Sequence, residues 1–259
     1  NNYVLVQYPQ LVTRSKVYDL TDPDGGRVIG EATVAGKILV CAYGPQRVLT
    51  NGEITSLDTD IAERVVAGLE VGVVSPVFAN FKIVVTCSYY SQFEEANVET
   101  VLMNNLLNKF SPGECQWTEE KLKYNDVLRF FYSNPSIHSV DSLTISKTDS
   151  ATITGAVKSG DNVTYTATNT FSIDDVVTVT GVSPSGLNCS AKVITARTST
   201  TFTVVNSAAS GTYASGGTAA VTSPNWGSVS GSDILYSTKG TLLKLQSEKI
   251  VLTLNSVSI

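Results

Sequence analysis

The sequence predicts an α+β core domain that carries an inserted all-β domain, built as a small sandwich or barrel. Residues 1–149 mix apolar, strand-like runs with charged segments that can form helices. Residues 150–222 are rich in Ser, Thr, Gly and Val and poor in charge, with turn residues at short intervals. Lys and Glu return in residues 223–259. We therefore expect a discontinuous core (1–149 plus 223–259) and an inserted β-module (150–222).

Composition bounds the class of protein. The chain has 259 residues, of which 42% are hydrophobic and 16% are charged, against about 25% charged in a typical soluble domain. The net charge of −5 and the absence of a Lys/Arg run give no general attraction to nucleic acid or anionic membranes. No apolar stretch approaches the roughly 20 residues needed to span a bilayer. The chain starts at Asn1, so a processed chain and a piece of a longer protein both stay open.

The four cysteines are widely spaced and form no CxxC or Cys/His cluster, which predicts no zinc site. Cys41 and Cys87 lie in apolar, strand-like runs, where a thiol behaves as a small buried hydrophobic group. We expect free thiols at Cys41, Cys87, Cys115 and Cys189, and neither a metal nor a cofactor.

The first half of the core is expected to hold a strand, a turn and a helix. Residues 37–43 are almost all apolar and predict a buried strand, and Asn51-Gly52 is typical of a turn. Thr55, with an acidic residue three positions later, predicts the start of a helix. That helix would align three apolar side chains on one face: Ile61, Val65 and Leu69.

The second half of the core is expected to hold two strands and two helices. Residues 81–89 alternate between apolar and polar, as a half-buried strand does. Ser91 and Glu94 form a capping-box pattern that opens a helix. Thr118 can cap a further helix that ends before Pro135, and residues 137–146 predict a closing strand.

The Ser/Thr-rich region predicts short strands separated by turn residues, at the spacing of a small sandwich or barrel. After it, residues 250–254 form an apolar run that we expect to return to the sheet of the core. The strands expected in the inserted region are 163–167, 176–180, 191–195, 201–205 and 217–221.

The stretch from Gln46 to Ser146 resembles the baseplate J-like proteins of contractile phage tails, which include the baseplate wedge proteins of T4-like phages. The resemblance follows the order of features: a Leu-Thr-Asn-Gly turn after an Arg, a helix over 57–70, the helix FEEANVETVLMNNLLNKF, the segment TEEKLKYNDVLRFFYSN and an alternating final strand. Residues 228–259 resemble the C-terminal strands of that family.

A second resemblance lies in the inserted region. Residues 171–182 and 200–204 are similar to a β-module that recurs in phage tail and fibre proteins. That module usually has Tyr-Asn-Gly where this chain has Gly186-Leu187-Asn188, so the loop differs.

The two resemblances imply a structural component of a phage baseplate that is located in the virion and has no enzymatic activity. Such a protein would be one wedge component, present in several copies around the tail axis. It would hold its neighbours and transmit rearrangement when the host is contacted. Its partners would be other baseplate and tail proteins and copies of itself, with no nucleic acid and no membrane insertion.

Catalytic chemistry has little support in the sequence. His138 is the single histidine, and on a strand it points away from the face of Asp141. The pairs Glu94-Glu95 and Glu119-Glu120 could suggest a glycosidase, but acids in the first turn of a helix are explained by the helix dipole. We predict no catalytic residue.

Ligand-binding motifs are also weak. The short acidic turns Asp174-Asp175 and Asp161-Asn162 supply too few oxygens for calcium, which needs six to eight. Residues 24–30 are Gly-rich but lack the Lys-Ser/Thr of a phosphate loop, and a hairpin turn explains them better. We therefore predict no metal-binding and no cofactor-binding residue.

One run of aromatic residues is a possible subunit interface: Phe130, Phe131 and Tyr132. Two of them can face the core of their own domain, and we expect Phe130 to be left for another surface. Aromatic residues are enriched in the cores of protein interfaces. The alternative is a helix that is buried on two sides within its own domain.

An alternative function is a tail fibre or adhesin that binds a host-surface glycan through the β-module. Clustered Trp and Tyr would support it, because sugars stack on aromatic rings. The only Trp or Tyr residues in the module are Tyr165 and Tyr213, and both tryptophans, Trp117 and Trp226, lie outside it. A wall hydrolase has still less support, because no paired catalytic constellation is present.

Overall fold

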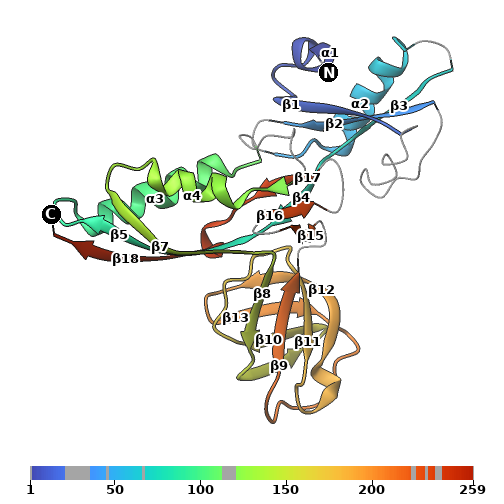
Figure 1. Cartoon of the computed structure of the whole chain (residues 1–259). Helices are drawn as coiled ribbons and strands as arrows, with labels where there is room; N and C mark the ends of the chain where they lie inside the picture. Colours follow the sequence, from blue (N-terminus) through green and yellow to red (C-terminus); the bar gives the residue numbers. More distant parts are fainter. Residues whose placement is uncertain are drawn as a thin grey trace. The chain divides into compact units, whose positions relative to one another are not determined.

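The computed structural model describes residues 2–20, 36–44, 47–65, 68–112, 121–222, 226–230, 233–236 and 241–258, which contain more strand than helix (Figure 1). The chain divides into two compact units. Unit 1 comprises residues 1–79, 108–126 and 225–244, and unit 2 comprises residues 80–107, 127–224 and 245–259. Among the described residues, no helix is both long and apolar enough to cross a bilayer.

Unit 1 is built around a three-stranded sheet in the order β1-β2-β3. The central strand β2 (Lys37–Tyr43) confirms the strand predicted there, and it pairs antiparallel with β1 (Arg14–Asp19) and parallel with β3 (Glu70–Val74). The other elements that lie wholly or mainly in this unit are α1 (Asn2–Gln7), α2 (Asn51–Ala62), β4 (Val77–Asn80), β6 (Lys121–Leu122), β15 (Trp226–Ser230), β16 (Asp233–Tyr236) and β17 (Thr241–Lys244).

The first long helix begins earlier than predicted. Helix α2 starts at Asn51, within the expected turn, and ends at Ala62, so the helix predicted to start near Thr55 and run to residue 70 is wrong at both ends. Thr50 is the N-cap, and its side chain and that of Glu53 form a capping box. The Arg47 guanidinium binds the Glu53 carboxylate at 2.7 Å. This hydrogen bond is the largest of the effects that lower the pKa of Glu53 to about 2. These contacts fix the start of the helix at Thr50.

Replacing Thr50 by Ala is expected to destabilise unit 1 by about 1 kcal/mol, because the cap satisfies a backbone N–H that no helical carbonyl can reach. The matched control is Thr59→Ala within the same helix, which removes an exposed hydroxyl but no cap. Urea denaturation of both variants measures the difference. Equal midpoints for the two variants would show that the cap does not hold this helix end.

Unit 2 contains a three-stranded sheet in the order β18-β5-β7. The central strand β5 (Lys82–Tyr90) buries Ile83, Val85, Cys87 and Tyr89, which confirms the predicted alternation. Strand β7 (Ile137–Ser146) pairs antiparallel with β5, and β18 (Ile250–Val257) pairs parallel with it. The final apolar run therefore returns to this sheet, as predicted.

Two helices accompany this sheet and lie along the same side of it (Figure 1). Helix α3 (Glu95–Lys109) begins just after the predicted capping pair and buries Val98, Leu102 and Leu106. Helix α4 (Tyr124–Tyr132) begins later than predicted. Residues 121–122, which were expected to be helical, form the short strand β6 because they pair with β16. The proposed cap Thr118 lies outside the described residues.

The Ser/Thr-rich region forms a seven-stranded sheet, in the order β8-β14-β11-β12-β13-β10-β9. All five predicted strands are present within a few residues, and β8 and β9 are additional. β8 pairs with β14, β9 pairs with β10, and only two residues separate β8 from β9 in the chain. The segment 148–159 thus joins the two ends of the sheet, as a barrel requires. The strands are β8 (Thr148–Thr152), β9 (Gly155–Ser159), β10 (Asn162–Thr166), β11 (Val176–Thr180), β12 (Cys189–Arg197), β13 (Thr201–Val205) and β14 (Thr218–Thr222).

We call this seven-stranded element the β-module; its strands span residues 148–222. It encloses its own hydrophobic cluster, in which Phe202 stacks on Tyr165 with ring centroids 5.0 Å apart. The β-module belongs to the same compact unit as β5, β7 and β18. The predicted domain boundaries at 149/150 and 222/223 stay a prediction.

Candidate functional site

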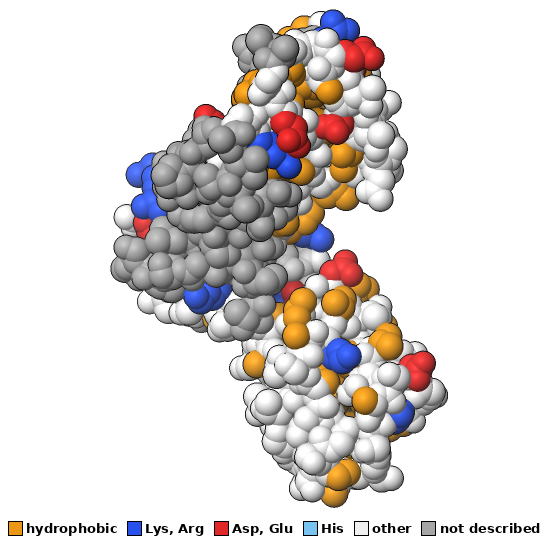
Figure 2. Space-filling model, turned by 90° about the vertical axis from the view of Figure 1, so that its right-hand side faces the viewer, with side chains coloured by type: hydrophobic (Ala, Val, Ile, Leu, Met, Phe, Trp, Pro, Cys, Tyr) orange, Lys and Arg blue, Asp and Glu red, His pale blue; other side chains and the backbone are white. Residues whose placement is uncertain are grey.

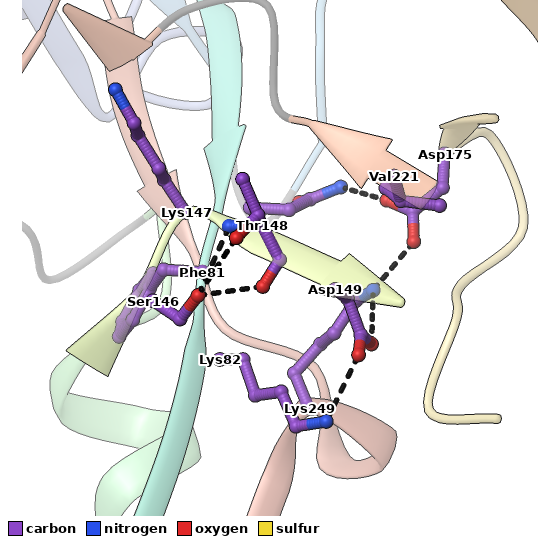
Figure 3. A pocket seen from close by; sticks show the side chains of 10 residues that line it. Phe81, Lys82, Ser146, Lys147, Thr148, Asp149, Asp175, Val221 and Lys249 are labelled. Atoms are coloured by element: carbon purple, nitrogen blue, oxygen red, sulfur yellow. Dashed lines mark hydrogen bonds and ion pairs between the residues drawn. The ribbon is translucent and has the colours of Figure 1, made fainter. Parts of the chain in front are cut away.

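A buried ionic network lies within unit 2, where the β-module meets the three-stranded sheet (Figure 3). Its centre is Lys249, which is the last residue of the 3₁₀ turn η3 (Ser247–Lys249) and is 2% exposed. A charged side chain this deeply buried is unfavourable unless it is paired and hydrogen-bonded.

Two carboxylates of the β-module pair with this lysine. Lys249 Nζ lies 2.6 Å from Asp175 Oδ2 and 3.5 Å from Asp149 Oδ2. Asp149 also binds Lys82 Nζ of β5 at 2.9 Å. Two lysines and two aspartates give the network no net formal charge, so each buried charge has an opposite partner.

Hydrogen bonds occupy the remaining carboxylate positions. Asp175 accepts from the backbone N–H of Ser172 at 2.8 Å and from the side-chain amide of Asn80 at 3.0 Å. Asp149 accepts from the hydroxyl of Thr170 and from the backbone N–H of Ser150. The donors come from the last residue of β4, from β8 and from the loop before β11.

The protonation of Asp149 reflects two opposing effects. Burial alone would raise the pKa of this carboxyl, because it penalises the charged form. The hydrogen bonds from Thr170 and Lys82 and the positive charge of Lys249 outweigh burial, so the pKa lies below its ordinary value. Asp149 is therefore ionised at neutral pH and matches the charge of the lysines.

The network leaves little room for a ligand. The cavity beside it has a volume of about 10 Å³, which is close to the space of one water molecule. Such a site cannot admit a substrate. The network is a structural contact: its ion pairs connect the β-module to Lys82 at the start of β5 and to Lys249 directly before β18.

The aromatic run at the end of α4 is arranged differently from the expectation. Phe130 is 8% exposed and Phe131 is fully buried, with their rings edge to face at 5.3 Å. Tyr132 is 55% exposed. The expectation that Phe130 is left for another surface is wrong: α4 turns Phe130 inward because it lies three residues, about one helical turn, after the buried Val127. Tyr132 is the outward residue.

A shallow apolar groove lies nearby in the chain, between the start of α3 and the segment that follows α4. It has a volume of about 470 Å³ and is lined by Phe93, Val98, Val101 and Pro135, with Glu94 among its polar residues. Phe93 is 37% exposed and Val101 is 47% exposed. Tyr132 lies two residues before Asn134, which also lines the groove, and we call the exposed residues Phe93, Val101 and Tyr132 the helical surface of unit 2.

The side chains of His138 and Asp141 each contact other residues. His138 is exposed and meets the ring of Tyr90 edge to face at 5.2 Å. The Asp141 carboxylate accepts hydrogen bonds from Ser139 at 2.7 Å and from Ser88 at 2.8 Å. These two hydrogen bonds are the main reason that the pKa of Asp141 lies below its ordinary value. Oδ2 therefore links β7 to Ser88 of β5, and Oδ1 accepts a hydrogen bond from within β7.

The other motifs have structural explanations where they are described. The backbone carbonyl of Glu94 accepts hydrogen bonds from the N–H groups of Asn97 and Val98, its carboxylate accepts one from the side-chain amide of Asn97, and Glu95 is in the first turn of α3. Asp175 belongs to the ionic network rather than to a calcium turn. No group of metal-ligating side chains is present among the residues that the structure describes. Glu119, Glu120 and the Gly-rich segment 24–30 lie outside that part of the chain.

Three of the four cysteines lie in the described part of the chain, and their state agrees with the prediction of thiols outside disulfides. Cys41, Cys87 and Cys189 are buried thiols that are not part of a disulfide. Burial raises the pKa of the Cys41 and Cys87 thiols to about 12, so both stay protonated. Cys115 lies outside the described residues.

Sequence reasoning missed the ionic network. Asp174-Asp175 was noticed as a pair, but Asp149, Lys82 and Lys249 lie far from it in the chain. One feature of the sequence pointed to Lys249: it directly precedes an apolar strand, so its side chain starts close to the hydrophobic interior. Its partners could not be found without the fold.

Comparisons with known proteins identify no family for this chain. No protein-family model matches the chain, and no curated protein matches it. Among solved structures, the chain is similar to a chain in the cryo-EM structure of the anti-feeding prophage baseplate, 6-fold symmetrised. The TM-score is 0.43 and the identity 13%, over 56% of this chain and 31% of that chain. A likeness this distant carries no inference about function.

Proposed function

We propose that the chain is a structural component of a contractile phage-tail baseplate, a wedge protein that acts through assembly interfaces and not as an enzyme. The observation that carries the proposal is the succession β5, α3, α4 and β7, which occurs in the order that the J-like resemblance implies. β18 then completes the same sheet after the β-module. A location in the virion follows from the proposal.

We further propose that the β-module is an insertion into this core. Its seven strands pair only with one another among the described strands, and its hydrophobic cluster is drawn from residues 151–221 alone. β7 leads into it, and β18 rejoins β5 beyond it. In this proposal the ionic network holds the inserted β-module in one orientation relative to the three-stranded sheet. A mechanical force on the module would then be transmitted to that sheet.

The helical surface of unit 2 is the proposed contact with a neighbouring baseplate protein. Tyr132, Phe93 and Val101 are large apolar or aromatic side chains that are exposed on this surface. Phe130 and Phe131 support it from within rather than contacting a partner. Exposed aromatic residues of this kind often contribute most of the binding energy of an interface.

Replacing Tyr132 by Ala is expected to weaken binding to the partner about 30-fold or more, as for a central aromatic contact, while the stability of the chain changes by less than about 0.5 kcal/mol. Co-sedimentation with purified baseplates measures binding, and urea denaturation measures stability. The matched control is Val157→Ala, at a 68% exposed position of the β-module. Undiminished assembly of the Tyr132 variant would rule out this surface as the contact.

The glycan-binding alternative has less support. Tyr165 is fully buried, with its hydroxyl donated to the Leu187 carbonyl, and the Tyr213 hydroxyl is donated to the carbonyls of Ile153 and Gly216. Neither ring is presented as a platform for sugar. Figure 2 shows, on the face it draws, a module surface that is mostly uncharged and polar, with scattered small apolar patches.

A further inference from the structure

Strand β18 forms one border of the three-stranded sheet of unit 2 (Figure 1). It pairs with β5 in unbroken parallel register from Ile250 opposite Ile83 to Val257 opposite Tyr90. Among the described strands, none pairs with its other side. The N–H and C=O groups on that side therefore have no strand partner within the part of the chain that the structure describes.

The direction of each backbone group in β18 follows from one hydrogen bond. The carbonyl of Val257 accepts from the N–H of Ser91, the residue that follows β5, at 2.9 Å. The N–H and C=O of one strand residue point to the same side, and successive residues alternate. Residues 251, 253, 255 and 257 therefore bond to β5, and residues 250, 252, 254 and 256 point their N–H and C=O outward.

This border lacks the features that keep strand edges from pairing. Native edge strands are commonly protected by charged side chains, prolines or bulges. β18 reads IVLTLNSV, with no charge, no proline and no register shift. The opposite border of the sheet, β7, carries Asp141 and two register shifts. In the β-module the two border strands, β8 and β9, are consecutive parts of segment 148–159, which pairs with β14 through its first half and with β10 through its second.

We propose that β18 pairs antiparallel with β18 of a second copy of this chain, across a two-fold axis at Leu254. This register uses only outward residues: Leu254 faces Leu254 of the second copy, and Leu252 faces Ser256 of the second copy. It forms about six inter-strand hydrogen bonds and joins the two sheets into one of six strands.

A second copy suits this border for three reasons. A strand without charges places no like charges opposite each other when it meets itself. Leu252 and Leu254 share the face of the buried Val85 and Cys87 and are themselves only partly buried, so the pairing covers apolar surface. A two-fold arrangement also makes each contact twice, and it is the commonest symmetry of soluble oligomers. This inference goes beyond the proposed function, since it does not depend on a baseplate.

The test is the mass of the purified full chain in solution, measured by size-exclusion chromatography with light scattering over a range of concentrations. The expected result is a concentration-dependent species of twice the 27.5 kDa chain mass. Ser256→Pro removes an outward N–H at an exposed position and spares the residues that bond to β5. It is expected to raise the dissociation constant of the dimer about tenfold or more, because two symmetric bonds are lost. Ser256→Ala, which keeps the N–H, is expected to dimerise like the parent.

A second pair of variants guards against a folding defect. Leu254→Lys and Leu254→Glu are each expected to be monomeric, because they bring like charges together at the axis, and their equimolar mixture is expected to dimerise. A chain that stays monomeric at every concentration would overturn the proposal. So would a dimer that Ser256→Pro leaves intact, or a mixture that does not recover. A strand from another protein would be indicated if tail components bind the monomer and Ser256→Pro abolishes that binding.

Discussion

Replacing Lys249 by Ala is expected to lower the free energy of unfolding of unit 2 by about 3–5 kcal/mol, the range for breaking a buried ion pair from one side. The change leaves Asp149 and Asp175 buried with Lys82 as the one remaining cation of the network. Asp175 then loses its cationic partner at 2.6 Å and keeps only neutral hydrogen-bond donors, and a buried carboxylate without an opposite charge is far less stable than one in water. Urea denaturation at neutral pH measures the loss.

The double variant Lys249→Met/Asp175→Asn is the matched control, because it removes one charge of each sign and fills the same space. It is expected to recover a large part of the stability that Lys249→Ala loses. If Lys249→Ala lowered the free energy of unfolding by less than about 1 kcal/mol, the ionic network would not be an important contact between the β-module and the sheet.

Acid is expected to weaken the same network. Because the folded pKa of Asp149 is below its ordinary value, the stability it contributes is present above the unfolded pKa of about 3.9. That contribution is lost as the pH falls through the lower, folded value. The difference in stability between the parent and Lys249→Ala is therefore expected to narrow below about pH 4. A difference that stays constant down to pH 3 would contradict the assignment.

Replacing Phe202 by Ala is expected to destabilise unit 2 by about 3–5 kcal/mol, as for other buried aromatic residues. Phe202 is fully buried at the centre of the β-module, stacked on Tyr165 and edge to face with Phe171 at 5.2 Å. Its loss leaves a cavity that the two remaining rings, Tyr165 and Phe171, and the short strands cannot close. Urea denaturation of the variant measures the loss.

The matched control for this core variant is Val205→Ala, which lies on the same strand and is 49% exposed. It is expected to change stability by less than about 1 kcal/mol. If Phe202→Ala cost no more than Val205→Ala, the ring cluster would not be the core of the β-module.

Local patterns identified elements that local forces determine. The alternation over residues 81–89 and the apolar run over residues 37–43 each predicted a strand, and both strands are present. The pattern was ambiguous where two caps competed: Thr50 with Glu53, and Thr55 with Asp58, have the same spacing. The ion pair of Glu53 with Arg47 favours the cap at Thr50. Interpreting Asn51-Gly52 as a turn led to the prediction of a later helix start.

Other features depend on contacts between distant residues and could not be predicted. Residues 121–122 form a strand because β16 pairs with them from more than 100 positions away. The ionic network needs Lys249 and Asp149, which are 100 residues apart. Phe130 is buried on the same face of α4 as Val127, one helical turn before it, and the sequence alone does not show which face of this helix packs inward.

The most direct test of the proposed function is to tag this chain in the cell or phage that produces it, purify intact contractile tails, and locate the tag by cryo-electron microscopy. The proposal predicts the chain in the baseplate, in a fixed whole-number ratio to the other wedge proteins. Recovery of the chain only as free protein, or bound to polysaccharide with no tail component, would contradict it.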